Sequence, residues 1–112
     1  MIKGTILIVD ENRNTLNSLE KIMLNEVEKV FSLTDPNRIN ELLRKNDVDI
    51  VMLDMNFKSG IHNGNEGLFW MREIFAYDKN ISIIIVTASG DIELAVRAIK
   101  EVGSDEDIFP PF

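Results

Sequence analysis

The chain alternates short runs of apolar residues with longer segments in which apolar side chains recur at helical spacing. Residues 4–9 are rich in branched apolar side chains, residues 50–53 are wholly apolar, and residues 81–86 form a similar run around one serine. Strands that are buried on both faces of a parallel sheet have this composition. These runs therefore predict the central strands of such a sheet.

Helical segments alternate with these strands. Apolar residues recur at spacings of three and four over residues 12–26, 66–77 and 91–103, and Pro36 directly after Asp35 marks the start of another helix. Residues 28–33 and 107–109 predict a second and a fifth strand. Strands alternating with helices indicate right-handed βαβ units and a parallel sheet with helices on both faces. The sequence predicts one α/β domain over residues 1–112, with no helix after its last strand.

Length and charge narrow the class of protein. A chain of 112 residues suffices for one domain around one core. The formal net charge is −7 and the 12 basic residues are scattered, which argues against direct binding of nucleic acid. Cysteine is absent, no apolar run has the length of a membrane span, and acids interrupt the first apolar run too early for a signal peptide. We therefore expect a cytoplasmic protein without membrane contact.

Carboxylates follow two of the predicted strands. Asp10 and Glu11 end the first apolar run, and Asp54 ends the run at residues 50–53. The carboxyl ends of parallel strands meet at one edge of the sheet, where α/β proteins bind ligands, so these acids should converge. Converging carboxylates repel one another unless a cation joins them, and Mg²⁺ prefers carboxylate and phosphate oxygens. The alternative is that the acids merely cap strands at a solvated edge, and spacing alone leaves both interpretations open.

Thr87 and Ala88 follow the run at residues 81–86 and should reach the same edge. The Thr87 hydroxyl or the Ala88 backbone N–H could donate to a phosphoryl oxygen, although a threonine at a strand end also bonds locally. The Gly- and Asn-rich segment at residues 55–67 lacks the G-x-x-x-x-G-K-[ST] pattern and follows the wrong strand for a dinucleotide fingerprint. Nucleotide binding is therefore not indicated.

Taken together, these features resemble a bacterial two-component receiver domain. The resemblance rests on the pair Asp10-Glu11, on Asp54, on Thr87-Ala88 and on the segment GDIELAVRAIKEVGS. That segment and GNEGLFWMREI are particularly similar to receivers of sigma-54-dependent transcription activators of the nitrogen-regulator type. The resemblance covers essentially the whole chain. It implies a flavodoxin-like, doubly wound parallel sheet of order 2-1-3-4-5, a (βα)5 fold whose fifth helix is missing from this chain.

The resemblance also implies a role for each candidate residue. Asp54 matches the phosphoacceptor, which attacks the phosphoryl group carried by a histidine kinase. Thr87 matches a switch hydroxyl that moves toward that phosphoryl group, and Ala88 offers its backbone N–H beside it. The implied Mg²⁺ ligands are Asp10, Glu11, Asp54 and the backbone carbonyl of Asn56.

Four positions depart from the family pattern. Glu11 stands where a second Asp is usual, which keeps the ligand atoms but adds one methylene. Lys58 stands where a proline is typical, in a connection that is longer than usual. Pro110 replaces the usual lysine, and Asp107 replaces the aromatic switch residue. The acidic half of the site therefore matches the family, whereas the basic half does not.

Two functions stay open. The first is a phosphoacceptor, not an enzyme, whose fourth helix and fifth strand switch to regulate transcription through an ATPase and DNA-binding output domain elsewhere in the full-length protein. The second is a degenerate receiver that acts as an interaction module or homodimer without phosphorylation, which Pro110 and Asp107 favour. A flavin carrier shares the sheet order but needs a hydroxyl-rich phosphate loop after the first strand, where this chain is acidic.

Overall fold

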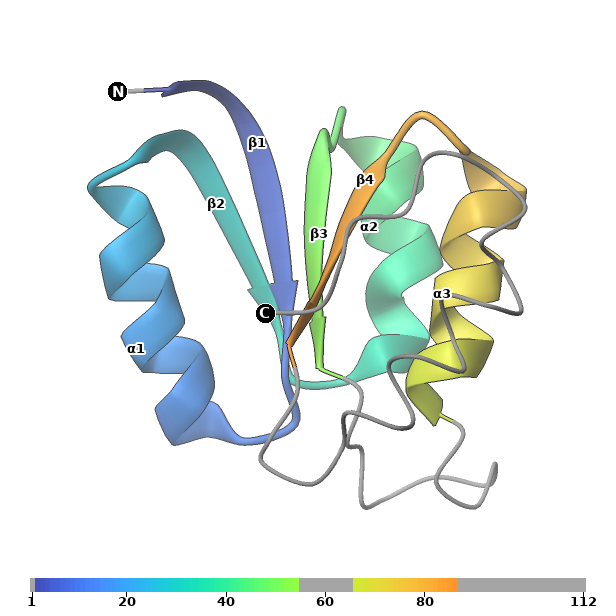
Figure 1. Ribbon diagram of the computed structural model, residues 1–112, viewed down its shortest axis with the longest axis horizontal. Helices are drawn as coiled ribbons and strands as arrows, with labels where there is room; N and C mark the ends of the chain where they lie inside the picture. Colours follow the sequence, from blue (N-terminus) through green and yellow to red (C-terminus); the bar gives the residue numbers. More distant parts are fainter. Residues whose placement is uncertain (1, 55–65, 87–112) are drawn as a thin grey trace.

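Four parallel strands form the centre of the molecule, in the order β2-β1-β3-β4 (Figure 1). The computed structural model describes residues 2–54 and 66–86. The strands are β1 (Ile2–Val9), β2 (Val27–Leu33), β3 (Ile50–Asp54) and β4 (Ser82–Val86). This arrangement confirms the predicted flavodoxin-like parallel sheet for the first four strands. The predicted fifth strand at residues 107–109 and the helix after Asp91 lie outside the described residues.

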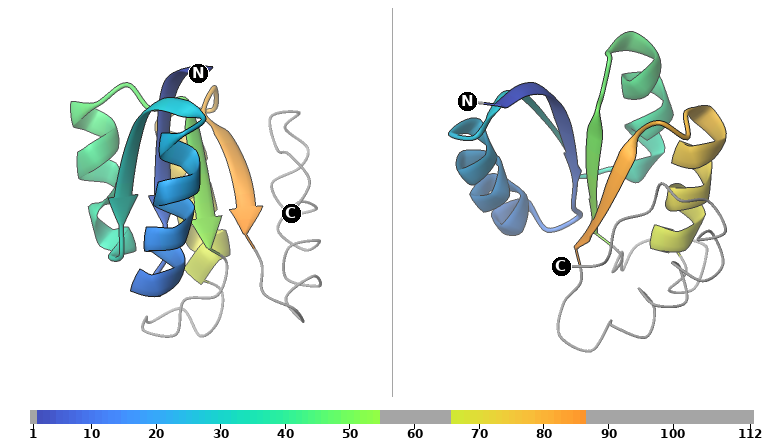
Figure 2. Two further views of the ribbon diagram at one scale, coloured as in Figure 1. Left: turned by 90° about the vertical axis from the view of Figure 1, so that its left-hand side faces the viewer. Right: turned by 45° about the horizontal axis from the view of Figure 1, so that its top comes forward.

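Helices cover both faces of the sheet, as Figure 2 shows. Helix α1 (Arg13–Leu24) packs on one face, while α2 (Ile39–Lys45) and α3 (Glu66–Tyr77) pack on the other. The start expected at Asp35 and Pro36 is confirmed, because the Asp35 side chain accepts the Asn37 N–H at 2.9 Å as an N-cap. The first turn is a 3₁₀ helix, η1 (Pro36–Arg38), in which the Arg38 N–H donates to the Asp35 carbonyl at 3.2 Å. The helices on both faces of the parallel sheet confirm the prediction of a doubly wound fold.

Each face of the sheet has its own buried core. Along β1 the side chains alternate between the two cores: Leu7 and Val9 face α2 and α3, whereas Ile6 and Ile8 face α1. The core under α2 and α3 is the larger, and Met71 and Ile74 of α3 are completely buried in it. Burial on both faces explains why the strands have nearly continuous apolar sequences. In the described residues, no helix has the length and apolar character needed to cross a membrane.

β1 begins earlier than its apolar run predicts. Gly4 has a φ of 146°, and the pairing of β1 with β2 shifts between Ile2 and Thr5. The Thr5 N–H donates to the Asp49 carboxylate at 2.8 Å, and the Asp49 N–H donates to the Thr5 carbonyl at 2.9 Å. These two bonds, formed with a residue distant in the sequence, hold the irregular start of β1 in the sheet.

Candidate functional site

Asp10 and Asp54 lie at the same edge of the sheet. Val9 is paired with Leu53 on the neighbouring strand, and each of the two acids comes one residue later. Both follow the strand direction to the carboxyl edge, which is the lower edge of the sheet in Figure 1. The parallel register therefore places the two carboxyl groups side by side, as expected from the strand ends.

Asp10 occupies an unusual position for an acid. Only 5% of its surface is exposed, and it is the only polar or charged residue among those described in residues 2–54 and 66–86 that is buried. Its backbone N–H donates to the Leu33 carbonyl at 3.1 Å, and its carboxylate accepts the Asn12 N–H at 2.8 Å. A further hydrogen bond joins its carboxyl group to that of Asp54. A hydrogen bond between two carboxyl groups needs a proton on one of them, because a carboxylate can only accept.

Burial, the largest effect, raises the pKa of Asp10 above the usual value for an aspartate. The hydrogen bonds from the Asn12 N–H and with Asp54 oppose this rise, and the negative charge of Glu11 adds to it. The pKa stays raised because these hydrogen bonds do not offset the loss of solvation. Among the described residues, no positively charged group contributes to the shift in the Asp10 pKa.

The donor set fits a hard divalent cation. Mg²⁺ in proteins is usually held by one or two carboxylates, with waters and phosphate oxygens completing the octahedron. Asp10 and Asp54 supply such a pair, and half-buried Glu11 is near enough for its charge to act on Asp10. Within the part of the chain that the structure describes, no group of three or more His, Cys, Asp or Glu side chains is arranged to hold a metal. The roles of Asp10, Asp54 and Glu11 as metal ligands stay predictions.

The remaining candidate residues lie outside the described residues. They are Asn56, Thr87 and Ala88, together with the departures at Lys58, Asp107 and Pro110. Their predicted roles therefore stay predictions.

Asn12 is a contributor that the sequence prediction overlooked. Its side chain caps α1 by accepting the N–H groups of Asn14 at 2.9 Å and Thr15 at 3.2 Å. At the same time its backbone N–H holds the Asp10 carboxylate. The signal was present, since an asparagine shortly after a strand and directly before a helix is a typical N-cap.

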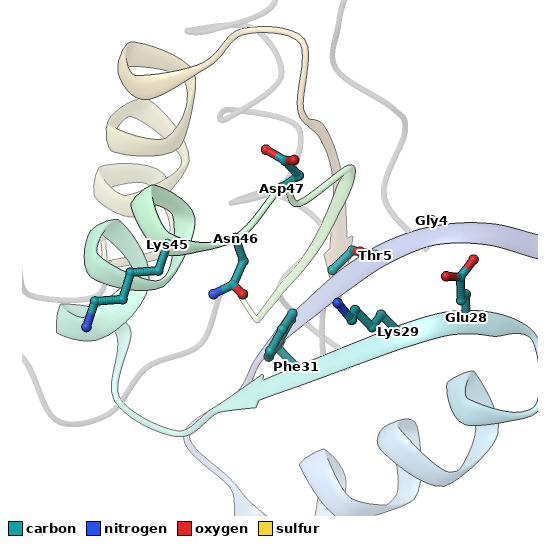
Figure 3. A pocket seen from close by; sticks show the side chains of 8 residues that line it. All are labelled: Gly4, Thr5, Glu28, Lys29, Phe31, Lys45, Asn46 and Asp47. Carbon is teal, nitrogen blue, oxygen red and sulfur yellow. The ribbon is translucent and has the colours of Figure 1, made fainter.

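Two surface hollows lie apart from the acid pair. One, of about 370 Å³, opens at the amino edge of the sheet between β1, β2 and the end of α2, and Figure 3 shows the residues that line it. The other, of about 390 Å³, lies between α1 and the connection from β2 to η1. Neither is lined by Asp10 or Asp54.

Comparison with known proteins points to one family. Residues 6–112 match the family model described as "Response regulator receiver domain". The chain is 31% identical over 107 residues to the aerobic respiration control protein ArcA of Escherichia coli K12, an alignment that covers 96% of this chain and 42% of ArcA. It is 27% identical over 108 residues to the C4-dicarboxylate transport transcriptional regulatory protein DctD of Rhizobium meliloti 1021, covering 96% of this chain and 22% of DctD.

A solved structure agrees with these matches. The N-terminal signal receiver domain of a two-component response regulator from Bacteroides fragilis superimposes with a TM-score of 0.79 and 36% identity, covering 98% of this chain and 84% of that one. The expected resemblance to receiver domains, including those of transcriptional regulators, is confirmed. The chain spans less than half the length of ArcA and less than a quarter of the length of DctD.

Proposed function

Because this chain belongs to the response regulator receiver domain family, we propose that it accepts a phosphoryl group on Asp54 from a histidine kinase, in a reaction that needs Mg²⁺. The contact between the Asp10 and Asp54 carboxyl groups at the carboxyl edge of the sheet is the observation that supports this best. An acid pair of this kind needs a cation to ionise fully, and phosphoryl transfer uses such a cation.

Asp54 is the nucleophile in this proposal. One of its carboxylate oxygens attacks the phosphorus of a phosphohistidine, the P–N bond breaks, and the electron pair of that bond returns to the imidazole of the kinase. A Mg²⁺ ion held at the acid pair would supply positive charge to the phosphoryl oxygens. Asp10, with Glu11 beside it, would hold the metal, and the Asn12 N–H fixes the Asp10 carboxylate in position. Asn56 adds its carbonyl, while Thr87 and Ala88 receive the phosphoryl oxygens.

The consequence of phosphorylation is a switch and not catalytic turnover. Receiver domains are signalling modules, and the modified Asp54 would shift an equilibrium between two conformations of the fourth helix and fifth strand. An output domain in the full-length protein, of the ATPase and DNA-binding kind, would then regulate transcription. The similarity to DctD, a transcriptional regulatory protein, supports this assignment.

A degenerate receiver is the second candidate, and two sequence departures favour it. Pro110 offers no ammonium group to a phosphoryl oxygen, and Asp107 is not an aromatic switch residue. Such a module would keep the acid pair but signal through a partner chain or a homodimer, without phosphorylation.

Intact-mass spectrometry separates the two candidates. We expect the wild-type protein, incubated with Mg²⁺ and acetyl phosphate, to gain one phosphoryl group, and Mg²⁺ with beryllofluoride to change the NMR signals around Asp54. Asp54→Asn should show neither change. Asp47→Asn is the matched control, because Asp47 is an exposed acid that lines the hollow at the opposite edge of the sheet. If the wild type stays unmodified under conditions that label an ordinary receiver, the degenerate module is the correct assignment.

A further inference from the structure

The hollow between α1 and β2 has the construction of a binding cavity. Four residues of α1 line it at spacings of three, four and seven from the first, and therefore from one face of the helix: Arg13, Leu16, Asn17 and Glu20. Residues 32–35 and Arg38 form the opposite wall. Leu16 and Leu33 are buried, so part of the lining is apolar, and the volume of about 390 Å³ lies in the range of small-molecule sites.

Two guanidinium groups line this cavity without an ion-pair partner. Neither Arg13 nor Arg38 is within ion-pair distance of a carboxylate among the described residues. The pKa of Glu41 in α2 is lowered first by the hydrogen bond from Lys45 and by the charge of Lys45, and then by the charge of Arg38. Each guanidinium carries five N–H donors in a planar fork and stays charged at every physiological pH. The two arginines come from different elements, α1 and η1, and both line the same cavity.

The two acids that line the cavity, Glu20 and Asp35, already accept hydrogen bonds, and the donor to Glu20 is a residue of the opposite wall. Glu20 accepts the Ser32 hydroxyl, and Asp35 accepts the Asn37 backbone N–H at 2.9 Å and its side-chain NH₂ at 3.0 Å. Glu20 also lies seven residues after Arg13, which corresponds to about 10 Å along a helix. The Arg13 end of the cavity is therefore the end that suits an anion.

We propose that this cavity binds a small phosphate monoester, with the phosphate between Arg13 and Arg38. One guanidinium fork satisfies both oxygens of a carboxylate, whereas two forks match the oxygens of a tetrahedral phosphate. The cavity is larger than a phosphate ion requires, and the Leu16 and Leu33 side chains offer contact to an organic group. This ligand does not occupy the acid pair, so the inference is independent of phosphorylation at Asp54.

One backbone hydrogen bond connects the wall of this cavity to the acid pair. The carbonyl of Leu33, one of the lining residues, accepts the backbone N–H of Asp10 at 3.1 Å. A ligand that orders this end of β2 would therefore act on Asp10 through a single hydrogen bond.

The hollow at the amino edge is less suited to an anion. Of its two lysines, Lys45 already pairs with Glu41 at 3.1 Å, and Figure 3 shows the Lys45 side chain extending away from Lys29. Only Lys29 is left to face an anion there among the described residues. A single ammonium group lacks the bidentate geometry of the arginine pair.

The test is a titration of the Asp54→Asn protein with glycerol phosphate and, separately, with inorganic phosphate, followed by calorimetry and NMR without Mg²⁺. We expect saturable binding of glycerol phosphate that Arg13→Gln and Arg38→Gln each weaken about tenfold, as expected for the loss of a charge-assisted hydrogen bond. Arg44→Gln is the matched control, because Arg44 is an exposed arginine at the end of α2 that does not line the cavity. It should leave the affinity unchanged.

Four results would overturn the proposal. They are no saturable binding, an equal loss of affinity in Arg44→Gln, affinity for inorganic phosphate that matches glycerol phosphate, and binding that appears only when Asp54 is present. A parallel titration of the wild type detects the last result, which would place the anion at the acid pair. Because Arg13 and Arg38 are both exposed, their replacement should leave the fold intact, and a thermal scan of each variant checks this.

Discussion

Asp10→Asn is the substitution that tests the electrostatics of the site most directly. Asparagine has the same shape as aspartate, and its side-chain oxygen can still accept the Asn12 N–H. Its NH₂ group can donate to the Asp54 carboxylate, so no proton has to be shared. The substitution removes a buried negative charge while keeping the hydrogen bonds. We therefore expect the metal-free variant to be more stable than the wild type above the pKa of Asp10 in the folded protein.

The direction in which stability changes with pH follows from the number of protons that the folded and unfolded states bind. The pKa of Asp10 is raised in the folded protein, so between its unfolded and folded values the folded state binds more protons. Stability of the wild type should fall as pH rises through that interval, and Asp10→Asn should lack this contribution. Each unit between the two pKa values corresponds to about 1.36 kcal/mol. With an unfolding entropy of about 0.24 kcal/mol/K for a chain of 112 residues, one unit amounts to about 6 °C in Tm.

Mg²⁺ should make the wild type more stable than Asp10→Asn, which reverses the order expected without metal. At a concentration of about 100 times Kd, a ligand stabilises the folded state by about 2.7 kcal/mol, or about 11 °C here. The wild type should gain this increment and Asp10→Asn should lose most of it, because a neutral amide is a weaker Mg²⁺ ligand. Thermal scans across a pH series, with chelator and then with Mg²⁺, measure both effects. A metal-free variant that is less stable at high pH, or one with the wild-type Mg²⁺ increment, would refute the reasoning. Asp47→Asn provides the control.

Two further substitutions test local structure. Gly4→Ala should reduce the free energy of unfolding by about 1–3 kcal/mol, because a φ of 146° is strained for any other residue. The new Cβ would also lie 3.2 Å from the Asp49 carboxylate; a loss below about 0.5 kcal/mol in urea denaturation would mean that the strand irregularity relaxes. Asn12→Ala should cost about 1 kcal/mol through loss of the α1 cap. Its Mg²⁺ increment should persist, since the Asn12 N–H to Asp10 is a backbone bond, and a lost increment would contradict this.

Local patterns predicted those parts of the fold that depend on local chemistry. The bounds of β3 and α3 match the expected residues 50–54 and 66–77, because an uninterrupted apolar run and a helical repeat each define one element. The start of β1 could not be predicted in this way. It depends on hydrogen bonds between Thr5 and Asp49, which become neighbours only after the sheet has formed.

In the site too, some features follow from the local sequence and others depend on tertiary contacts. The meeting of Asp10 and Asp54 follows from parallel strands that both end in an acid, and the sequence is sufficient to predict it. The sequence does not distinguish the environments of adjacent Asp10 and Glu11, yet the first is buried and the second only half-buried. That difference depends on how the chain turns from β1 into α1. The arginine cavity was also missed, since Arg13 and Arg38 are brought together only by packing of α1 beside β2.

Asp10 stays buried beside Asp54 because the core fixes the ends of the two strands that carry these acids. Leu7, Val9, Val51 and Leu53, in the two strands that carry the acids, are all completely buried. They fix the strand ends, so Asp10 and Asp54 cannot move apart to relieve their repulsion. The bonds from Asn12 and to Leu33 restrain Asp10 further. The repulsion can therefore be relieved only by a proton, a cation or a change of residue. A stronger core would make the metal-free protein more stable, but it would leave the demand for positive charge at the acid pair unchanged.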